Sequence, residues 1–232
     1  MYDIVFISFY EPLAEHNFKT LRQRFATAQR VDGIKGIHQA HIEAAKKSLT
    51  KMFWAVDGDA VIEKNFMFDY EVPEKDLTAV HVWRSRNPVN DLQYGYGGVK
   101  LLPKRMTLEM NTDTTDMTTS ISTRFRAMEQ VSNITAFNSD PFSAWKSAFR
   151  ECVKLSSKVI DRQEDLETEQ RLDVWCTKGL NRPYGDFAIE GAKTGRQFGK
   201  LNADSPQHLK LINDFDWLKK HFEETCSVSE YY

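Results

Sequence analysis

The sequence predicts an α/β fold, in which a mixed, mostly parallel β-sheet is flanked by helices and followed by a helical C-terminal region. Up to residue 157, short apolar runs alternate with amphipathic helical patterns. After that residue the patterns are helical only. Hydrophobic residues are 41% of the 232 and charged residues 28%, which is enough apolar material for a globular core. We therefore expect a catalytic core over 1–157 and a helical region over 158–232 that packs on it.

The first elements follow the order strand, helix, helix, strand. The apolar run "IVFISF" at 4–9 predicts a buried strand, and "KMFWAV" at 51–56 predicts a second one. Between them, apolar residues recur at helical spacing over 15–29 and again over 36–50. This order is typical of an α/β domain.

Later elements are read in the same way. A third strand is expected at 77–86, followed by a loop rich in Asn, Pro and Gly at 87–99. Further strand and helix patterns follow along the chain: a short helix near 119–129, a strand at 131–137, and helices at 141–157, 161–176, 183–200 and 206–224. Ser139 or Asp140 is placed to cap the helix at 141–157, with Pro141 in its first position.

Composition argues against several classes of protein. The net charge of −2 lacks the strongly basic balance of many nucleic-acid-binding proteins. No apolar stretch approaches the roughly 20 residues of a membrane-spanning helix. Three cysteines are far apart, and no secretion signal is recognised, which favours reduced thiols and a cytoplasmic location. We expect no association with membranes.

Two aspartates follow the second predicted strand directly, in "AVDGDAV". Asp57 and Asp59 would lie at the carboxyl end of a parallel strand, where α/β folds bind ligands. Their hard oxygen ligands suit Mg²⁺ or Mn²⁺, which complete their coordination with phosphates and water. Gly58 is expected to let the backbone turn sharply, so that the carboxylates face one ion. The alternative is an ordinary Asp-Gly turn at a strand end.

The sequence "YGYGGVK" at 94–100 is the second informative stretch. Tyr94 and its neighbour Tyr96 offer flat faces for a sugar or a base, and Gly97 and Gly98 permit close backbone approach. Lys100 is placed to meet a phosphate. A glycine-rich hairpin with surface tyrosines is the alternative.

Transfer with inversion at a sugar carbon requires a general base. The polar stretch "NTDTTDMTT" offers Asp113 and Asp116, of which we favour Asp116. Asp140 is a third candidate, for which a role as a helix cap is the rival explanation. A retaining reaction needs no such base, and the sequence leaves inversion and retention open.

These motifs resemble a known family. "MFWAVDGDAVI" resembles the DxD strand end of nucleotide-sugar glycosyltransferases with the GT-A fold, and the preceding stretch 30–51 is similar to theirs. The match covers roughly 3–70, with a weaker match at the glycine loop. The whole chain also resembles small phage-encoded glycosyltransferases that modify DNA bases, which would place it in the host cytoplasm.

The resemblance implies a metal-dependent transfer of a sugar from a nucleoside-diphosphate sugar, a UDP-sugar, with Mn²⁺ or Mg²⁺ as cofactor. It implies 5-hydroxymethylcytosine in DNA as one acceptor, with glucose or arabinose as the sugar. The implied metal ligands are Asp57, Asp59 and His208. The implied nucleotide-sugar contacts are Tyr10, Glu11, Arg30, Asp32, Lys35, Asp57, Tyr94, Gly97 and Gly98.

Two other functions stay open. A sugar-phosphate nucleotidyltransferase also uses paired aspartates, but the glycine-rich basic loop expected after the first strand is absent from "SFYEPLAEHN". A non-enzymatic nucleotide-binding module would use the aspartates only as a turn. Arg30 and Lys35 are equally compatible with solvated surface. The oligomeric state is not indicated.

Overall fold

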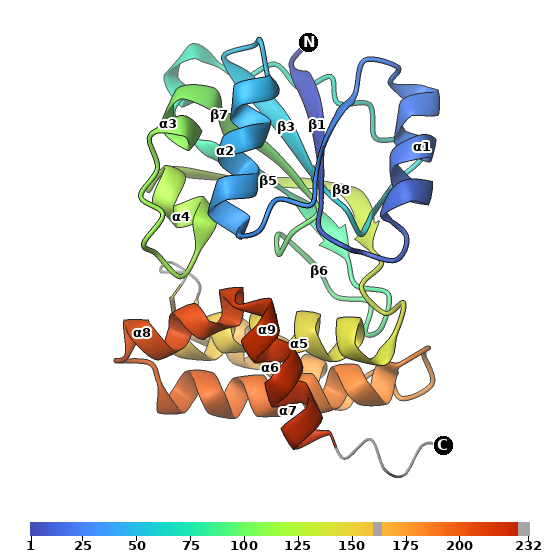
Figure 1. The fold of residues 1–232 in the computed structure, drawn as a ribbon, viewed down its shortest axis with the longest axis vertical. Coiled ribbons are helices and arrows are strands. Elements are labelled where there is room, and N and C mark those ends of the chain that lie inside the picture. Colours follow the sequence, from blue (N-terminus) through green and yellow to red (C-terminus); the bar gives the residue numbers. More distant parts are fainter. Residues whose placement is uncertain (160–163, 227–232) are drawn as a thin grey trace. The chain divides into compact units, whose positions relative to one another are not determined.

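A computed structural model describes residues 1–159 and 164–226 of the chain. It forms two compact units. The first consists of Met1–Asn87, Gln93–Asp113 and Met117–Ala136. The second consists of Pro88–Leu92, Thr114–Asp116 and Phe137–Tyr232. Thus the helix at 141–157, which the sequence assigned to the core, groups with the helical unit (Figure 1).

The first unit is built on one sheet with the strand order β2-β1-β3-β7-β5-β8-β4, and β6 pairs with β5. Strand β1 is parallel to β2 and β3, whereas β7 is antiparallel to both β3 and β5. The sheet is therefore mixed, as expected. It is not mostly parallel, because the antiparallel pairs (β3–β7, β5–β7, β5–β6 and β4–β8) outnumber the parallel pairs (β1–β2, β1–β3 and β5–β8). The strands are β1 (Asp3–Ser8), β2 (Gln29–Asp32), β3 (Met52–Asp57), β4 (Ala60–Ile62), β5 (Val80–Arg86), β6 (Gln93–Tyr94), β7 (Val99–Pro103) and β8 (Phe125–Thr135).

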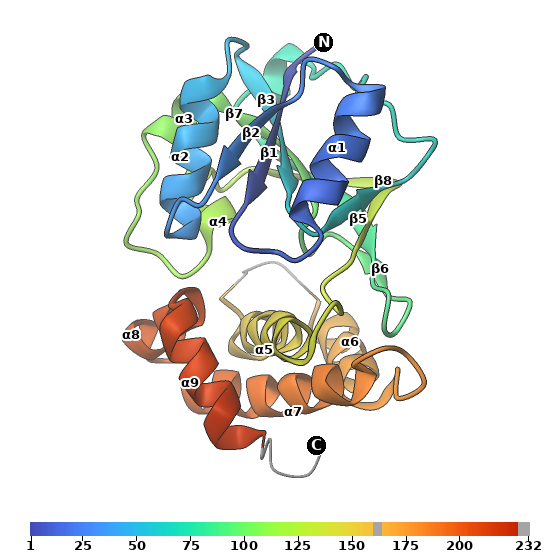
Figure 2. The same cartoon turned by 45° about the vertical axis from the view of Figure 1, so that its right-hand side comes forward.

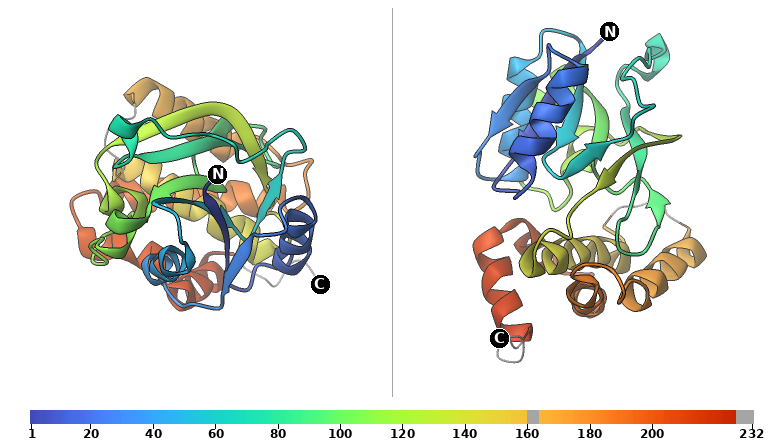
Figure 3. Two further views of the ribbon diagram at one scale, coloured as in Figure 1. Left: turned by 90° about the horizontal axis from the view of Figure 1, so that it is seen from above. Right: turned by 90° about the vertical axis from the view of Figure 1, so that its right-hand side faces the viewer.

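Helices cover both faces of this sheet (Figures 1 and 2). Successive residues of a strand point to opposite faces, so Phe6 and Trp54 join one buried cluster and Val5 and Phe53 join another. Residues of α1 pack in the first cluster, and residues of α2 and α4 in the second. Figure 3 shows the sheet as a curved layer. The helical elements of this unit are α1 (Ala14–Arg24), α2 (Ile37–Lys47), the 3-10 turn η1 (Glu74–Asp76), α3 (Lys104–Leu108) and α4 (Met117–Ile121).

One predicted helix of the first unit is largely a strand. The stretch near 119–129 is helical only in α4, and β8 begins at Phe125. Strand β8 runs parallel to β5, with a bulge between Trp83 and Ser85. The two-residue repeat of β8 is interrupted by this irregular pairing, which the local sequence does not reveal. Strand β2 was also missed, because four residues with one buried side chain carry no readable period.

The second unit is helical, as expected for the C-terminal region. Of the two predicted caps, Ser139 and Asp140, it is Asp140 that caps α5, because its Oδ1 accepts a hydrogen bond of 2.8 Å from the Ser143 N–H. The predicted helix at 206–224 is divided, since Asp214 caps a new helix through the N–H groups of Asp216 and Trp217. No helix in the described part of the chain is long and apolar enough to cross a membrane. The elements are α5 (Pro141–Ser157), α6 (Asp165–Thr177), α7 (Gly185–Leu201), α8 (Pro206–Leu209), η2 (Lys210–Asn213) and α9 (Phe215–Thr225).

Glycines spaced four residues apart let α7 lie directly against the backbone of α5. A Cβ atom at Gly191 would lie 2.3 Å from the Trp145 carbonyl oxygen, and one at Gly195 would lie 2.4 Å from that of Phe149. These distances are too short for any side chain, so the glycines set the separation of the two helices.

We predict that Gly195→Ala lowers the free energy of unfolding by about 1–3 kcal/mol, because overpacking against backbone forces the helices apart. This loss outweighs the roughly 0.5–1 kcal/mol that Ala gains over Gly inside a helix. Urea denaturation followed by circular dichroism measures it. Gln197→Ala, on an exposed position of the same helix, should change stability by less than about 0.5 kcal/mol. An unchanged or raised stability of Gly195→Ala would contradict the packing argument.

Candidate functional site

The candidate site lies at the carboxyl ends of β1 and β3. The chain passes from β1 to β2 on one side of β1, and later to β3 on the other side. Open α/β sheets bind ligands at such a point, where the direction of strand order reverses. Asp57 is the last residue of β3, and Asp59 follows two residues later. The sequence therefore placed the aspartate pair correctly relative to the strand.

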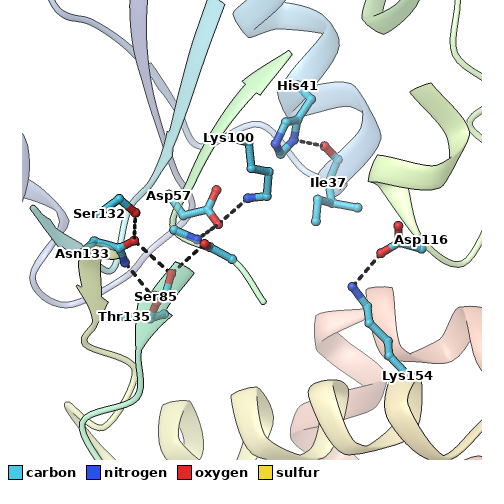
Figure 4. A network of polar contacts seen from close by, with 12 residues as sticks. Ile37, His41, Asp57, Ser85, Lys100, Asp116, Ser132, Asn133, Thr135 and Lys154 are labelled. Carbon is cyan, nitrogen blue, oxygen red and sulfur yellow. Dashed lines mark hydrogen bonds and ion pairs between the residues drawn. The ribbon is translucent and has the colours of Figure 1, made fainter. Parts of the chain in front are cut away.

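Asp57 is held by two donors on the same oxygen (Figure 4). Its Oδ2 accepts hydrogen bonds from Lys100 Nζ at 2.8 Å and from the Gly98 N–H at 2.9 Å. Its Oδ1 accepts none from the described residues, and the side chain is 31% exposed. One carboxylate oxygen is thus fixed and the other is open to a ligand.

The charges of Asp57 and Lys100 neutralise each other within the site. Burial by itself raises the pKa of Asp57, but the charge of Lys100 and the Gly98 N–H outweigh it, so the pKa of this carboxyl lies below its usual value. Lys100 is buried on β7, and Asp57 supplies its counter-charge. The pair therefore presents an ionised carboxylate and an ammonium group side by side.

His41 is a part of this site that the sequence analysis did not assign. Its Nδ1 lies 2.8 Å from the Ile37 carbonyl oxygen, so Nδ1 carries the hydrogen and Nε2 carries the lone pair. Nε2 is buried without a hydrogen-bond partner among the described residues. Burial, assisted by the charge of Lys100, lowers the pKa of His41 to about 4, which keeps the imidazole neutral. Its place on the apolar face of α2 was the available sequence signal.

Gly97 and Gly98 form the wall of the site next to Asp57. Both have positive φ, +155° and +81°, and a Cβ atom at Gly98 would lie 2.3 Å from the Asn133 amide. The Ser85 hydroxyl donates to the Gly97 carbonyl oxygen at 2.8 Å, and it also lies 2.9 Å from Asn133 Oδ1 (Figure 4). Polar side chains of β5 and β8 therefore support this loop from behind.

Gly58 and Asp59 form the turn between β3 and β4, as the sequence predicted. The φ of Gly58 lies outside the left-handed region, so the turn by itself does not require glycine. A Cβ atom there would lie 2.6 Å from Glu11 Oε2, which accepts a hydrogen bond of 2.6 Å from the Phe9 N–H. The Glu11 side chain of the loop after β1 therefore packs directly on Gly58. Asn17 of α1 also donates to the Gly58 carbonyl oxygen at 3.0 Å.

The other predicted nucleotide contacts of β1 and β2 lie at the same edge of the sheet. Tyr10 is 83% exposed and has φ +62°, a conformation that costs energy in a non-glycine residue. Arg30 pairs with Asp32 at 3.0 Å and with Glu15 at 2.6 Å, so both predicted side chains are already engaged. Lys35 is exposed in the loop before α2.

The tyrosines of the glycine loop differ in accessibility. Tyr94 is only 5% exposed, and its ring centroid lies 4.8 Å from that of Tyr96. Tyr96 is partly exposed. Tyr96 is therefore the more exposed residue of the two.

The predicted base candidates and His208 have separate settings. Asp116 is buried in the second unit, where its Oδ1 pairs with Lys154 Nζ at 2.9 Å. Asp113 is exposed in the first unit. His208 is exposed in the second unit, with Nδ1 2.7 Å from the Ser205 hydroxyl at the start of α8. The ion pair gives Asp116 a structural role that requires no substrate.

The residues present fit a divalent cation in part. In residues 1–159 and 164–226 no group of three or more His, Cys, Asp or Glu side chains is arranged to hold a metal. Asp57 nevertheless offers an ionised carboxylate with an open oxygen, and Asp59 is close in the chain. Mg²⁺ and Mn²⁺ commonly bind through one or two carboxylates and the phosphates of a substrate. The chemistry of these oxygen ligands is therefore suitable for a metal that arrives with a diphosphate.

No protein-family model matches the chain, and no curated protein sequence matches it.

We predict that His41 makes the protein sensitive to acid. Between its ordinary pKa of 6.5 and about 4, the unfolded chain binds a proton on His41 that the folded chain does not. Stability should therefore fall as the pH falls through this window, by about 3 kcal/mol from this residue. His41→Gln should lose less unfolding free energy than the wild type between pH 7 and pH 4, measured by urea denaturation.

The matched control is His16→Gln, because His16 is exposed on α1. This variant should keep the acid sensitivity of the wild type. Equal losses in the wild type and His41→Gln would show that the imidazole is charged or solvated in the folded protein.

Proposed function

We propose that this protein is a metal-dependent glycosyltransferase that uses a nucleoside-diphosphate sugar, with UDP as the nucleotide. The observation that carries the proposal is an ionised aspartate with an open oxygen at the end of β3, beside a buried lysine. It lies at the reversal point of an α/β sheet, together with a second acidic residue, Asp59. Carboxylates and an ammonium group in one place suit a metal-bound diphosphate.

The topology supports a GT-A-like fold as part of this proposal. Strands β1 to β3, with α1 and α2 between them, form a nucleotide-binding half whose carboxyl ends gather at one edge. The antiparallel strand β7 then brings the glycine loop and Lys100 to the end of β3. This arrangement gives the DxD motif and the glycine loop, which the resemblance singled out, a common position.

The settings of the residues at the ends of β1 and β2 support the roles proposed for them. Tyr10 is exposed and suits stacking on the base, and Glu11 orders the loop beneath it. Arg30 and Asp32 lie at the end of β2, in reach of a ribose or phosphate once their mutual ion pair is exchanged.

Asp57 and Asp59 are the residues that would hold the cation, which offsets the charge on the leaving diphosphate when bound. Lys100 adds a second positive charge beside it. His208 is less suited, because it belongs to the second unit and contacts Ser205. For an inverting reaction, Asp113 is the more accessible base, since Asp116 is held by Lys154.

The proposed acceptor is 5-hydroxymethylcytosine in DNA, on the strength of the sequence resemblance. A base in a duplex must leave the stack before a sugar can be added. Several arginines that could contact phosphates are paired within the protein: Arg86 with Glu63, and Arg124 and Arg126 with Asp76. Contacts to DNA would therefore be made by partly neutralised side chains, and binding should be modest at physiological salt.

UDP is expected to bind the wild-type protein in the presence of Mn²⁺ and at least about tenfold more weakly without it, because the metal joins the diphosphate to the carboxylates. Asp59→Ala should lose the gain in UDP affinity that Mn²⁺ gives. Asp69→Ala should keep this gain, because Asp69 is an exposed aspartate after β4. Isothermal titration calorimetry measures both. The metal-dependent proposal would be refuted if UDP did not bind. It would also be refuted if the affinity for UDP did not depend on Mn²⁺ in either the wild type or Asp59→Ala.

Hydroxymethylated DNA incubated with the protein, Mn²⁺ and UDP-glucose or UDP-arabinose is expected to gain the mass of one sugar less one water per modified cytosine, with release of UDP. Mass spectrometry of the digested nucleosides measures the gain, and unmodified DNA is the control. No gain on any hydroxymethylated DNA would exclude the DNA acceptor. Release of pyrophosphate from a nucleoside triphosphate and a sugar phosphate would instead support a nucleotidyltransferase.

A further inference from the structure

One oxygen atom of the proposed metal site, Oδ2 of Asp57, is already paired with a positively charged side chain. Lys100 Nζ lies 2.8 Å from Asp57 Oδ2, and the Gly98 N–H shares this oxygen at 2.9 Å. A divalent cation that approaches Asp57 therefore meets an ammonium group on the same carboxylate. Two positive charges on one carboxylate repel each other, and the repulsion is strong where water is excluded.

Burial keeps Lys100 in this position. Its side chain is 9% exposed, and it stands between the buried residues Val99 and Leu101 of β7. An ammonium group removed from water needs a compensating charge or hydrogen-bond acceptors. Asp57 provides the charge, so Lys100 can leave it only if another acceptor is close.

His41 offers such an acceptor. Its Nε2 lone pair is buried and has no partner among the described residues, while Nδ1 is tied to Ile37. The imidazole interacts electrostatically with both Lys100 and Asp57. Lys100 lies between these two side chains in Figure 4. A buried acceptor without a donor is unfavourable, and a shift of the ammonium group would satisfy it.

We propose that Lys100 is a resident cation that competes with the divalent metal for Asp57, and that it turns to His41 Nε2 when metal and diphosphate bind. This inference rests on the proposed function. Without ligand, Lys100 neutralises Asp57 and holds the carboxylate in place. With ligand, the metal takes that role. An ammonium group has three N–H donors, so one bond to His41 leaves two for phosphate oxygens.

The test measures Mn²⁺ binding to the full chain without nucleotide, from the electron paramagnetic resonance signal of unbound Mn²⁺. Lys100→Met removes the charge and keeps the length of the side chain. It should bind Mn²⁺ at least about tenfold more tightly than the wild type, equivalent to about 1.4 kcal/mol. Lys104→Met is the matched control, because Lys104 donates to the Ser48 carbonyl oxygen instead of Asp57. Its affinity should be unchanged.

A second variant keeps the test valid if Lys100→Met does not fold. Lys100→Arg should bind Mn²⁺ more weakly than the wild type, because a guanidinium grips a carboxylate at two points. Equal or weaker binding by folded Lys100→Met overturns the competition, as does equal or tighter binding by folded Lys100→Arg. Absence of Mn²⁺ binding in every variant overturns it as well. The proposed function is judged separately, by UDP binding and sugar transfer.

The movement of Lys100 has its own measurement. The ¹⁵N chemical shift of His41 Nε2 should change when Mg²⁺ and UDP are added to the wild type, because the lone pair gains a donor. The same addition to Lys100→Met should leave the shift nearly unchanged. An unchanged shift in the wild type, or an equal change in both proteins, would show that Lys100 does not turn to His41.

Discussion

The ion pair between Asp57 and Lys100 ties together two strands that run in opposite directions. Asp57 ends β3, and Lys100 stands near the start of β7, paired in register with Ala55. Because Lys100 is buried, its charge has to be met from within the protein, and the end of β3 is where that charge is met. The position of the glycine loop follows, since Gly98 exchanges hydrogen bonds with Asp57 through both its N–H and its carbonyl.

Around this ion pair, glycines allow neighbouring side chains to lie directly against the backbone. Gly58 lies against Glu11, and Gly98 lies against Asn133, so the loops after β1 and before β7 are both fixed on the aspartate motif. The same principle operates in the second unit, where Gly191 and Gly195 bring α7 onto the carbonyl oxygens of α5. Tight packing of this kind transmits small displacements, so the geometry at Asp57 depends on residues such as Asn133, which lies behind Gly98.

Several features of the site could be read from the sequence because they are local. An apolar run followed by Asp-Gly-Asp places carboxylates at a strand end, and Asp-Pro at 140–141 predicts a helix start, which Asp140 caps in the structure. Features that depend on long-range pairing were missed. Strand β8 was taken in part for a helix, and His41 was not assigned to the site, because neither pattern shows which strand or charge lies opposite.

The sequence by itself determined the α/β class, the aspartates at the end of β3 and the helical C-terminal region, because strand and helix periodicity and helix capping act over a few neighbouring residues. Only the tertiary structure decided that the mixed sheet is not mostly parallel and that the Glu11 side chain packs on Gly58. It also decided that Lys100 neutralises Asp57 beside a buried His41. These depend on residues more than 40 positions apart along the chain, whose meeting is set by the packing of the sheet and not by local preference.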